Sequence, residues 1–370
     1  MQPTRRISVL SVGQDNLFAE LPHCCVDHVS TGKSITPFSA QRKSLLRRIP
    51  AILVRVCAGK YDLIVLPAVD LRWAYDQSFL KRGLRFVVAH SLRFRPISAC
   101  VNRLLSRRAT RVIVLDRYDS HDTLLDYLSC VTSARRYFKS NLRESDHIYL
   151  NMPGNGGGCQ FKYLPYWIVI EKYEMPVQHE KDIDILFAGN VNSEERRVSL
   201  EMLRQLELEG YRIKIVAGHL PFREYLALMS RSWLTLSPQG CGYNGFRHYE
   251  SMVVGSVPLI NRSEPPILND FRHGENCFLY STTRADLGQV AKEALSDKAR
   301  LVRMSQRLPQ FVVSKHSIQA VGQYLLRETF EGWEGDGITS QPRYCQGSDY
   351  GEDAVSDCQE TIETQVTRES

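Results

Sequence analysis

The sequence predicts an α/β protein built from two doubly wound, Rossmann-like domains that face a cleft. Short apolar runs typical of buried parallel strands alternate with helical stretches along most of the chain. The 370 residues leave room for two such domains and a tail, and 43% hydrophobic with 24% charged residues is the composition of a soluble globular protein. We place the domains at residues 1–172 and 182–330, followed by a disordered acidic tail at residues 335–370.

The first domain shows four apolar runs that predict strands, at residues 7–12, 61–66, 85–89 and 111–115. Helical spacing is present at residues 41–58, interrupted at Pro50, and at residues 71–82 and 97–106. Residues 14–40 carry no clear pattern. The first strand is too short and is broken too early to be a signal peptide, and no apolar stretch is long enough to predict a transmembrane helix.

The second domain has a clearer pattern. Strands are predicted at residues 184–188, 212–216, 233–236, 257–260 and 277–280. Ser193 is placed to cap a helix that runs to about residue 209, and Pro221 precedes a helix at residues 222–230. Further helices are expected at residues 246–254, 284–308 and 317–330. We expect the last of these to pack back on the first domain.

The most informative stretch covers residues 236–262. It contains a strand, a loop with three glycines, a helix and a second strand, with Gly255 placed to end the helix. Arg247 lies in the first turn of the helix, where a phosphate is favoured, and Glu250 follows on the same side. A carboxylate there can accept hydrogen bonds from a sugar diol. The alternative is that Arg247 and Glu250 form an ordinary exposed ion pair.

Residues 246–258, with the sequence FRHYESMVVGSVP, resemble the nucleotide-sugar signature of GT-B glycosyltransferases of the exostosin-like and group-1 type. The resemblance implies that Glu250 holds the nucleotide ribose or donor sugar and that Arg247 holds the diphosphate. The retaining branch usually carries a second Glu eight positions before the first, where this chain has Gly242, and this favours inversion. The other donor-binding residues that we expect are Gly240, Tyr243, Asn244, Gly245 and Phe246.

Two further basic residues, Arg196 and Arg197, fall in the first turns of the helix that follows the strand at residues 184–188. Arginine is unfavourable at the positive end of a helix, so an anionic ligand would explain its presence there. This stretch is similar to the GT-B loop that presents a basic residue to the donor diphosphate. The alternative is a solvated helix surface.

An inverting reaction needs a base in the first domain that deprotonates the acceptor hydroxyl. His90 and Asp119 each follow a predicted strand and are the candidate catalytic residues. His90 is equally consistent with a structural histidine. Asp119 is equally consistent with a turn or a helix cap.

The charge is uneven along the chain. Residues 343–370 carry seven acidic residues and two arginines, so residues 1–342 have a net charge of +11. That surplus suits an anionic donor or membrane surface, and it is not interleaved with aromatics as nucleic-acid binding would require. The ten cysteines lack a CxxC pair, which predicts reduced thiols in a cytoplasmic protein.

The resulting hypothesis is a glycosyltransferase that moves a sugar from a nucleotide-sugar donor to a glycan or lipid-linked acceptor, in the cytoplasm or at the inner face of the membrane. Resemblance to GT-B enzymes implies no bound metal, and the nucleotide sugar is a substrate, so no cofactor is expected. Two alternatives stay open: a nucleotide-sugar epimerase, and a non-catalytic nucleotide- or glycan-binding protein on the same scaffold.

Overall fold

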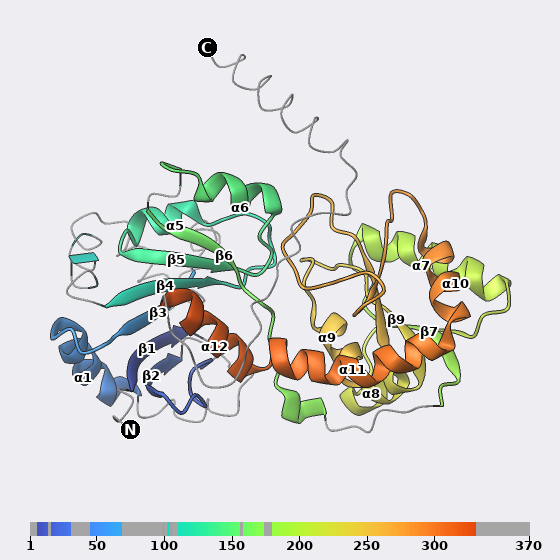
Figure 1. Ribbon diagram of the computed structural model, residues 1–370, viewed down its shortest axis with the longest axis horizontal. Coiled ribbons are helices and arrows are strands. Elements are labelled where there is room, and N and C mark those ends of the chain that lie inside the picture. Colours follow the sequence, from blue (N-terminus) through green and yellow to red (C-terminus); the bar gives the residue numbers. More distant parts are fainter. Residues whose placement is uncertain are drawn as a thin grey trace, which may run out of the picture. The chain divides into compact units, whose positions relative to one another are not determined.

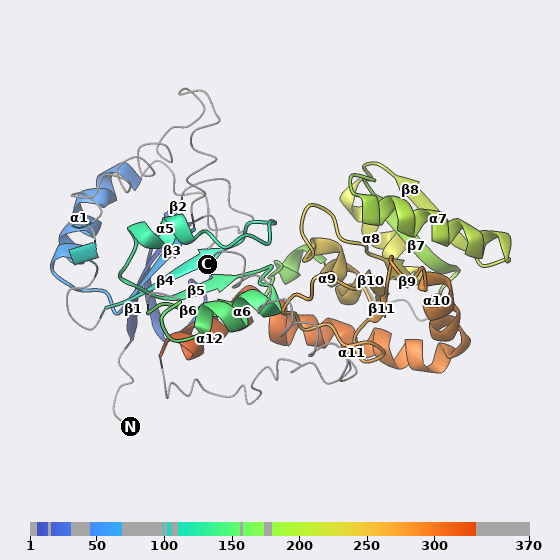
Figure 2. The ribbon, with the colours of Figure 1, turned by 90° about the horizontal axis from the view of Figure 1, so that it is seen from above.

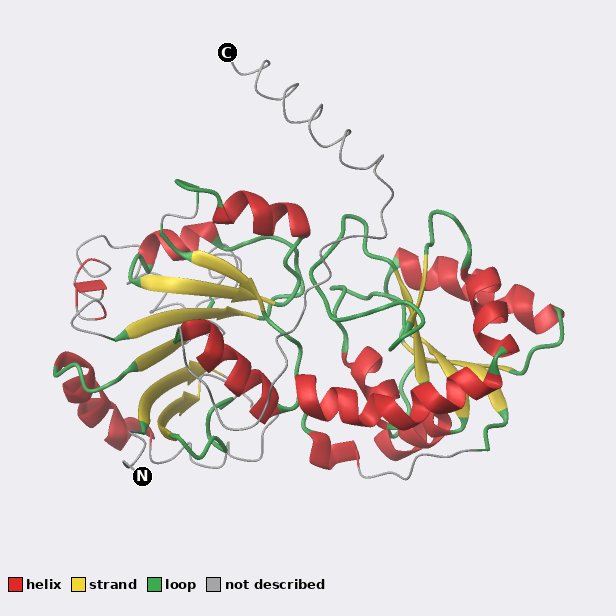
Figure 3. Ribbon diagram, in the orientation of Figure 1, coloured by secondary structure: helices red, strands yellow, loops and turns green. Residues whose placement is uncertain are grey.

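The computed structural model describes residues 6–13, 16–30, 45–68, 99, 102–103, 105, 110–155, 158–173 and 180–330. His90, the predicted strand at residues 85–89, the predicted helix at residues 71–82 and the acidic tail lie outside these residues. The described chain forms two separate parallel β-sheets with helices around each of them (Figure 3). The predicted fold class is therefore confirmed.

The first sheet has six parallel strands in the order β2-β1-β3-β4-β5-β6 (Figure 1). Three of them, β2, β5 and β6, were not predicted, because charged side chains interrupt their apolar pattern. In β5, for example, Arg135 and Arg136 precede the buried Tyr137 and Phe138. The strands are β1 (Ile7–Gly13), β2 (Cys24–Ser30), β3 (Leu63–Pro67), β4 (Arg111–Asp116), β5 (Ala134–Lys139) and β6 (Gln160–Tyr163).

Among the described residues, the helices α1 (Leu45–Cys57), α5 (Leu125–Cys130) and α6 (Glu144–Asn151) accompany this sheet. The 3₁₀ turn η2 (Ile170–Tyr173) instead packs into the core of the second sheet through Tyr173. The predicted interruption at Pro50 was wrong, since α1 continues through it. Proline removes one backbone donor, but Ile52 is buried in the core of the first sheet, and such packing supplies most of the stability of a helix in a folded protein.

The second sheet has five parallel strands in the order β11-β10-β9-β7-β8. The predicted second-domain strands are confirmed to within about two residues. The three central strands are almost continuously apolar and buried, whereas the edge strand Ile213–Ala217 is partly exposed. They are β7 (Ile183–Gly189), β8 (Ile213–Ala217), β9 (Ser232–Leu236), β10 (Val257–Asn261) and β11 (Phe278–Tyr280).

Six helices follow the strands of the second sheet. Ser193 caps the first of them, as predicted, by accepting a hydrogen bond from the backbone N–H of Arg196. Gly255 has φ +75° just after α9, which confirms its role in ending that helix. The helices are α7 (Glu194–Leu208), α8 (Phe222–Ser230), α9 (Phe246–Val253), α10 (Leu287–Ser296), α11 (Lys298–His316) and α12 (Ile318–Thr329). In the part of the chain that the structure describes, no helix offers an apolar stretch long enough to cross a membrane.

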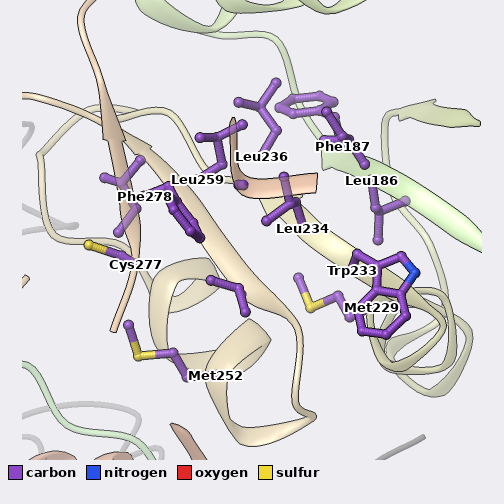
Figure 4. Close-up of a cluster of buried hydrophobic side chains, with 14 of the residues drawn as sticks. Leu186, Phe187, Met229, Trp233, Leu234, Leu236, Met252, Leu259, Cys277 and Phe278 are labelled. Atoms are coloured by element: carbon purple, nitrogen blue, oxygen red, sulfur yellow. The ribbon is translucent and has the colours of Figure 1, made fainter. Parts of the chain in front are cut away.

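The strand order makes the second sheet doubly wound. The chain moves from β7 to β8, then returns past β7 to β9, so right-handed crossovers put α7 and α8 on opposite faces. Figure 2 shows α7, α8, α9, α10 and α11 around the strands. The core under these helices is apolar: side chains from four strands meet Met229 of α8 and Met252 of α9 (Figure 4).

The last helix, α12, leaves the second sheet and packs on the first, as predicted (Figure 1). The Tyr324 hydroxyl donates to the backbone oxygen of Tyr163 in β6 at 2.8 Å. Arg111 of β4 donates from Nη1 to the backbone oxygen of Thr329 at 2.7 Å. The last described helix therefore packs on the sheet that contains the first described strand.

Candidate anion-binding site

The chain adds β8 on one side of β7 and then β9 on the other side, so the strand order changes direction between β7 and β9. Open α/β sheets bind ligands at such a point, outside the carboxyl ends of the strands. Two segments meet there. One is the end of β7 at Gly189, and the other is the loop of residues 237–245 between β9 and α9, here called the glycine loop. The functional side chains are built around these two segments.

Arg247 lies over the end of β7. Its guanidinium carbon is 5.0 Å from the centre of the Phe187 ring. Gly189 has φ +140°, and a Cβ at this position would overlap the Arg247 guanidinium, so the glycine makes room for the charge. The Nε and Nη1 atoms of Arg247 are buried and have no hydrogen-bond partner. Two nitrogen atoms of this cation therefore lack an acceptor within the described protein.

Arg196 reaches the same place from the first turn of α7. Its Nη1 donates to the backbone oxygen of Asn190 at 2.8 Å and to Asn192 Oδ1 at 2.7 Å. Its Nη2 lies 2.7 Å from where a Cβ on Gly240 would be, so a larger residue there would displace the guanidinium. Its Nε is buried without a partner. Arg196 was one of the predicted donor-site residues.

Burial and the nearby positive charge of Arg247 both lower the pKa of Arg196. Within the described residues neither guanidinium forms an ion pair. Two like charges that converge without a counter-ion repel each other, and unbonded buried N–H groups cost free energy. Both costs disappear when an anion with several oxygen atoms binds between them.

Arg197 does not reach this place. Its side chain is 54% exposed and pairs with Glu194 and Glu201, the latter at 2.7 Å. The structure therefore places Arg197 on the solvated face of α7, one of the two alternatives considered for it. One residue of rotation along a helix, about 100°, separates it from Arg196.

Glu250 is buried and is held by two tyrosines. Its Oε1 accepts from the Tyr173 hydroxyl at 3.0 Å and its Oε2 accepts from the Tyr225 hydroxyl at 2.8 Å. Burial raises the pKa of Glu250, and the two hydrogen bonds and Arg247 oppose that shift. Among the described residues Arg247 and Glu250 do not form the exposed ion pair that was the alternative interpretation, because Glu250 is buried against the two tyrosines.

The glycine loop is fixed by a neutral histidine, His248. Its Nε2 lies 2.8 Å from the backbone oxygen of Tyr243, which can only accept, so Nε2 carries the proton and Nδ1 accepts from Ser237 Oγ at 2.8 Å. Burial lowers its pKa to about 4, which keeps the ring neutral. Tyr243 is itself buried. His248 therefore joins the two ends of the loop.

Gly245 and Phe246, two predicted site residues, form the start of α9. Gly245 is the cap residue and has no side chain to occupy the first backbone N–H groups of the helix. Phe246 is 39% exposed and packs edge-on against Tyr166, with ring centres 4.9 Å apart. The helix start is thus open toward a ligand, with Arg247 one residue further on.

Asp119 comes from the first sheet, in the loop after β4, and lies against the glycine loop. A Cβ on Gly242 would be 2.8 Å from the Asp119 backbone oxygen and 2.9 Å from Asn141 Nδ2. A glutamate therefore has no room at position 242, which gives the glycine a physical cause. Burial raises the pKa of Asp119, while Arg117 and Lys139 lower it.

A buried ion pair supports the loop that carries Asp119. Asp116 and Lys139, at the ends of β4 and β5, are both fully buried and lie 3.0 Å apart. Asp116 also accepts from the Tyr137 hydroxyl at 2.5 Å and from the backbone N–H of Tyr118 at 2.9 Å. All these contacts fix the beginning of the loop.

Several residues of this site were not found from the sequence. Gly189 and Asn141 each follow a predicted or observed strand end, a signal that could have identified them. Tyr173 and Tyr225 carried no such signal, because their link to Glu250 depends on packing. His121 lies two residues after Asp119. Its Nδ1 is buried without a hydrogen-bond partner, and burial followed by the charge of Arg143 lowers its pKa.

Among the residues that the structure describes, no group of three histidine, cysteine, aspartate or glutamate side chains is arranged to hold a metal ion.

Comparisons with known proteins give structural matches. No family model and no curated protein matches the sequence. A glycosyltransferase from Rickettsia africae matches 89% of this chain over 100% of its own length, with TM-score 0.53 and 9% identity. An α-glucosyltransferase solved with UDP and a 13-mer DNA containing a HMU base matches 87% of this chain over 98% of its own, with TM-score 0.50 and 12% identity. The chain thus has the GT-B fold of glycosyltransferases, as the sequence predicted.

Proposed function

We propose that this protein transfers a glycosyl group from a nucleoside-diphosphate sugar to a hydroxyl group of a glycan or lipid-linked acceptor. The observation that carries the proposal is the convergence of Arg196 and Arg247, with N–H groups that have no partner, at the reversal point of the second sheet. A diphosphate has the charge and the oxygen atoms that such a pair of cations needs. The α-glucosyltransferase of similar fold was solved with UDP, which makes UDP the first nucleotide to test.

The leaving group explains the use of two arginines. When the bond between the sugar and the diphosphate breaks, negative charge develops on the diphosphate oxygens. Guanidinium groups that are already in place stabilise that charge without reorganisation. Because Arg196 and Arg247 supply positive charge, the proposed reaction is metal-independent.

Glu250 is proposed to hold the ribose or the donor sugar. A carboxylate has about four lone-pair sites, and the two tyrosine hydroxyls occupy two of them. The remaining sites can accept hydrogen bonds from a sugar diol. Glu250 lies one turn of α9 from Arg247, a spacing that suits a nucleotide whose diphosphate binds at the helix start.

Asp119 is proposed to be the base that deprotonates the acceptor. It lies against the glycine loop, and burial shifts its pKa upward, toward the pH at which a carboxylate is an effective base. Inversion of the anomeric centre is the stereochemical outcome that goes with such a base. Gly242, which leaves no room for a second carboxylate on the donor side, supports the same outcome.

The proposal is tested by calorimetric titration of the folded protein with UDP. We expect Arg247→Ala to weaken binding about 30-fold or more, since a hydrogen bond to a charged group contributes about 2 kcal/mol. Arg197→Ala is the matched control, because it removes an arginine charge from the solvated face of α7, one position after Arg196 and outside the site. We expect it to leave the dissociation constant within twofold of the wild type.

If UDP does not bind, the same titration is repeated with GDP, ADP, CDP and TDP. A folded wild-type protein that binds none of the five would contradict the proposed function. Equal losses of affinity in Arg247→Ala and Arg197→Ala would show that general surface charge, not a built site, attracts the nucleotide.

A further inference from the structure

We propose that Asn141, a residue of the first sheet, is a positioning residue for the diphosphate site of the second sheet. This inference rests on the proposed function. It states that the glycine loop takes its ligand-binding shape only while it is hydrogen-bonded to Asn141. Donor affinity then depends on a side chain that does not itself touch the donor.

Asn141 and Asn244 form a buried pair of amides, here called the amide joint. Asn141 is 1% exposed and Asn244 is 4% exposed. Asn141 Oδ1 accepts from the backbone N–H of Asn244 at 3.1 Å and from its Nδ2 at 3.4 Å. Asn141 Nδ2 donates to the backbone oxygen of Asp119 at 3.2 Å. One side chain therefore holds both the glycine loop and the loop that carries Asp119.

The second amide of the joint strengthens the same contact. Asn244 Nδ2 donates to the backbone oxygen of Ser140 at 2.6 Å. Asn244 Oδ1 accepts from the Tyr249 hydroxyl on α9 at 3.3 Å. Asn244 is thus tied to the first sheet on one side and to the helix that carries Arg247 on the other.

The joint lies close to the anion site along the chain. Asn244 immediately precedes Gly245, the cap residue of α9, and Arg247 follows three residues after Asn244. A shift of the backbone at Asn244 changes the start of α9, and with it the place of the Arg247 guanidinium over Gly189. Because the contact of Gly242 with Asp119 leaves no space for even a Cβ, the loop is already closely seated at the joint.

The physical consequence is preorganisation. Removal of the Asn141 amide leaves the buried N–H of Asn244 without its acceptor, so the loop must move to satisfy it. Part of the binding free energy is then used to return the loop to its ligand-binding shape, so the affinity for the ligand falls. The expected size is about tenfold, which corresponds to about 1.4 kcal/mol.

The test is a double-mutant cycle with UDP as the titrated ligand. We expect Asn141→Ala and Asn244→Ala each to weaken UDP binding about tenfold. We expect the double variant to lose less than the hundredfold product of the two single effects, because the Asn244 side chain and the Asn244 backbone N–H share Asn141 Oδ1 as acceptor. If Asn141→Ala fails to fold, Asn244→Ala removes the side-chain half of the joint, namely the bonds from Asn244 Nδ2 to the backbone oxygen of Ser140 and to Asn141 Oδ1, and keeps the backbone bond.

Asn276→Ala is the matched control. Asn276 is also buried, accepts from the backbone N–H of Arg272 at 2.7 Å and donates to the backbone oxygen of Asp270 at 2.8 Å, in a loop outside the amide joint. It separates a general loss of stability from a specific effect on the site. We expect it to lower the melting temperature and to leave UDP affinity within twofold of the wild type.

Each outcome decides one question. Wild-type binding of UDP that is unchanged in Asn141→Ala, or effects that multiply in the double variant, would overturn the role of Asn141 and leave the proposed function intact. A comparable loss in Asn276→Ala would reduce the effect to ordinary destabilisation. A folded wild type that binds none of the five nucleoside diphosphates would remove the proposed function, and this inference with it.

Discussion

Charged side chains gather at the strand ends of both sheets, and the two sheets treat them in opposite ways. At the end of the first sheet, Asp116 and Lys139 are fully buried and neutralise each other. At the end of the second sheet, Arg196 and Arg247 have the same sign, and their inner N–H groups lack partners. In both arrangements the free-energy cost of desolvating the charges must be offset. Within the described protein, only the charges of the first sheet have partners that offset this cost.

The difference separates structural charges from functional ones. A buried charge whose partner belongs to the fold contributes to holding the fold, and loss of one partner leaves the other uncompensated. Converging like charges destabilise the empty protein slightly and are stabilised by a ligand. Burial alone does not identify a site, whereas two like charges with unpartnered buried N–H groups at one strand end indicate a missing anion.

The largest effect that we expect is on the paired charges. Lys139→Met leaves the Asp116 carboxylate buried without a cation, and it should lower the free energy of unfolding by about 3–5 kcal/mol. The measurement is urea unfolding at neutral pH. As a control, Arg231→Ala breaks an exposed ion pair with Asp182 and should have no measurable effect.

The same measurement on Arg247→Ala can break the comparison. Removal of this unpaired charge should leave the free energy of unfolding unchanged or raise it, although it weakens UDP binding. A large loss of stability in this variant would mean that Arg247 is as structural as Lys139. The contrast between the two sheets would then be wrong.

The second effect concerns pH and the glycine loop. Burial lowers the pKa of His248 from 6.5 to about 4. Between pH 6.5 and pH 4, His248 is therefore protonated in the unfolded chain and neutral in the folded protein. Stability from this group is therefore complete above pH 6.5 and is lost as the pH falls toward 4. By linkage the loss at pH 5 is about 2 kcal/mol.

The check compares unfolding of the wild type with that of His248→Gln between pH 7 and pH 5. Glutamine has no proton to gain in this range, so the variant is less stable at pH 7 and the gap should narrow by about that amount at pH 5. A gap that stays constant would show that His248 does not titrate as its burial requires.

The smallest effect concerns the seat of Arg247. Gly189→Ala places a Cβ where the guanidinium lies, so we expect UDP binding to weaken about tenfold, equivalent to about 1.4 kcal/mol. Gly210→Ala is the matched control, since Gly210 also has a positive φ but nothing within 4 Å of the added Cβ. Both variants should lose about 1 kcal/mol of stability from backbone strain. Equal UDP affinity in the two variants would contradict the assigned place of Arg247.

The sequence predicted the strands of the second sheet better than those of the first, and the reason is physical. The three central strands of the second sheet, β7, β9 and β10, are buried on both faces and form continuous apolar runs, which is a strong signal. In the first sheet, β2 contains Asp27 and β5 ends in Lys139, whose charge is compensated by a residue distant in sequence. Such strands have no local signature, because the compensation exists only after folding.

The sequence by itself determined the elements that depend on neighbouring residues. The strand, the glycine loop and the helix that carries Arg247 and Glu250 are consecutive in the sequence. Residue spacing was therefore enough to predict these three elements. Only the tertiary structure decided which charges converge. It brought Arg196 to Arg247, turned Arg197 to solvent, and joined Asn141 to Asn244 across 103 residues of sequence. Contacts of that range depend on how whole sheets pack, and local spacing carries no record of them.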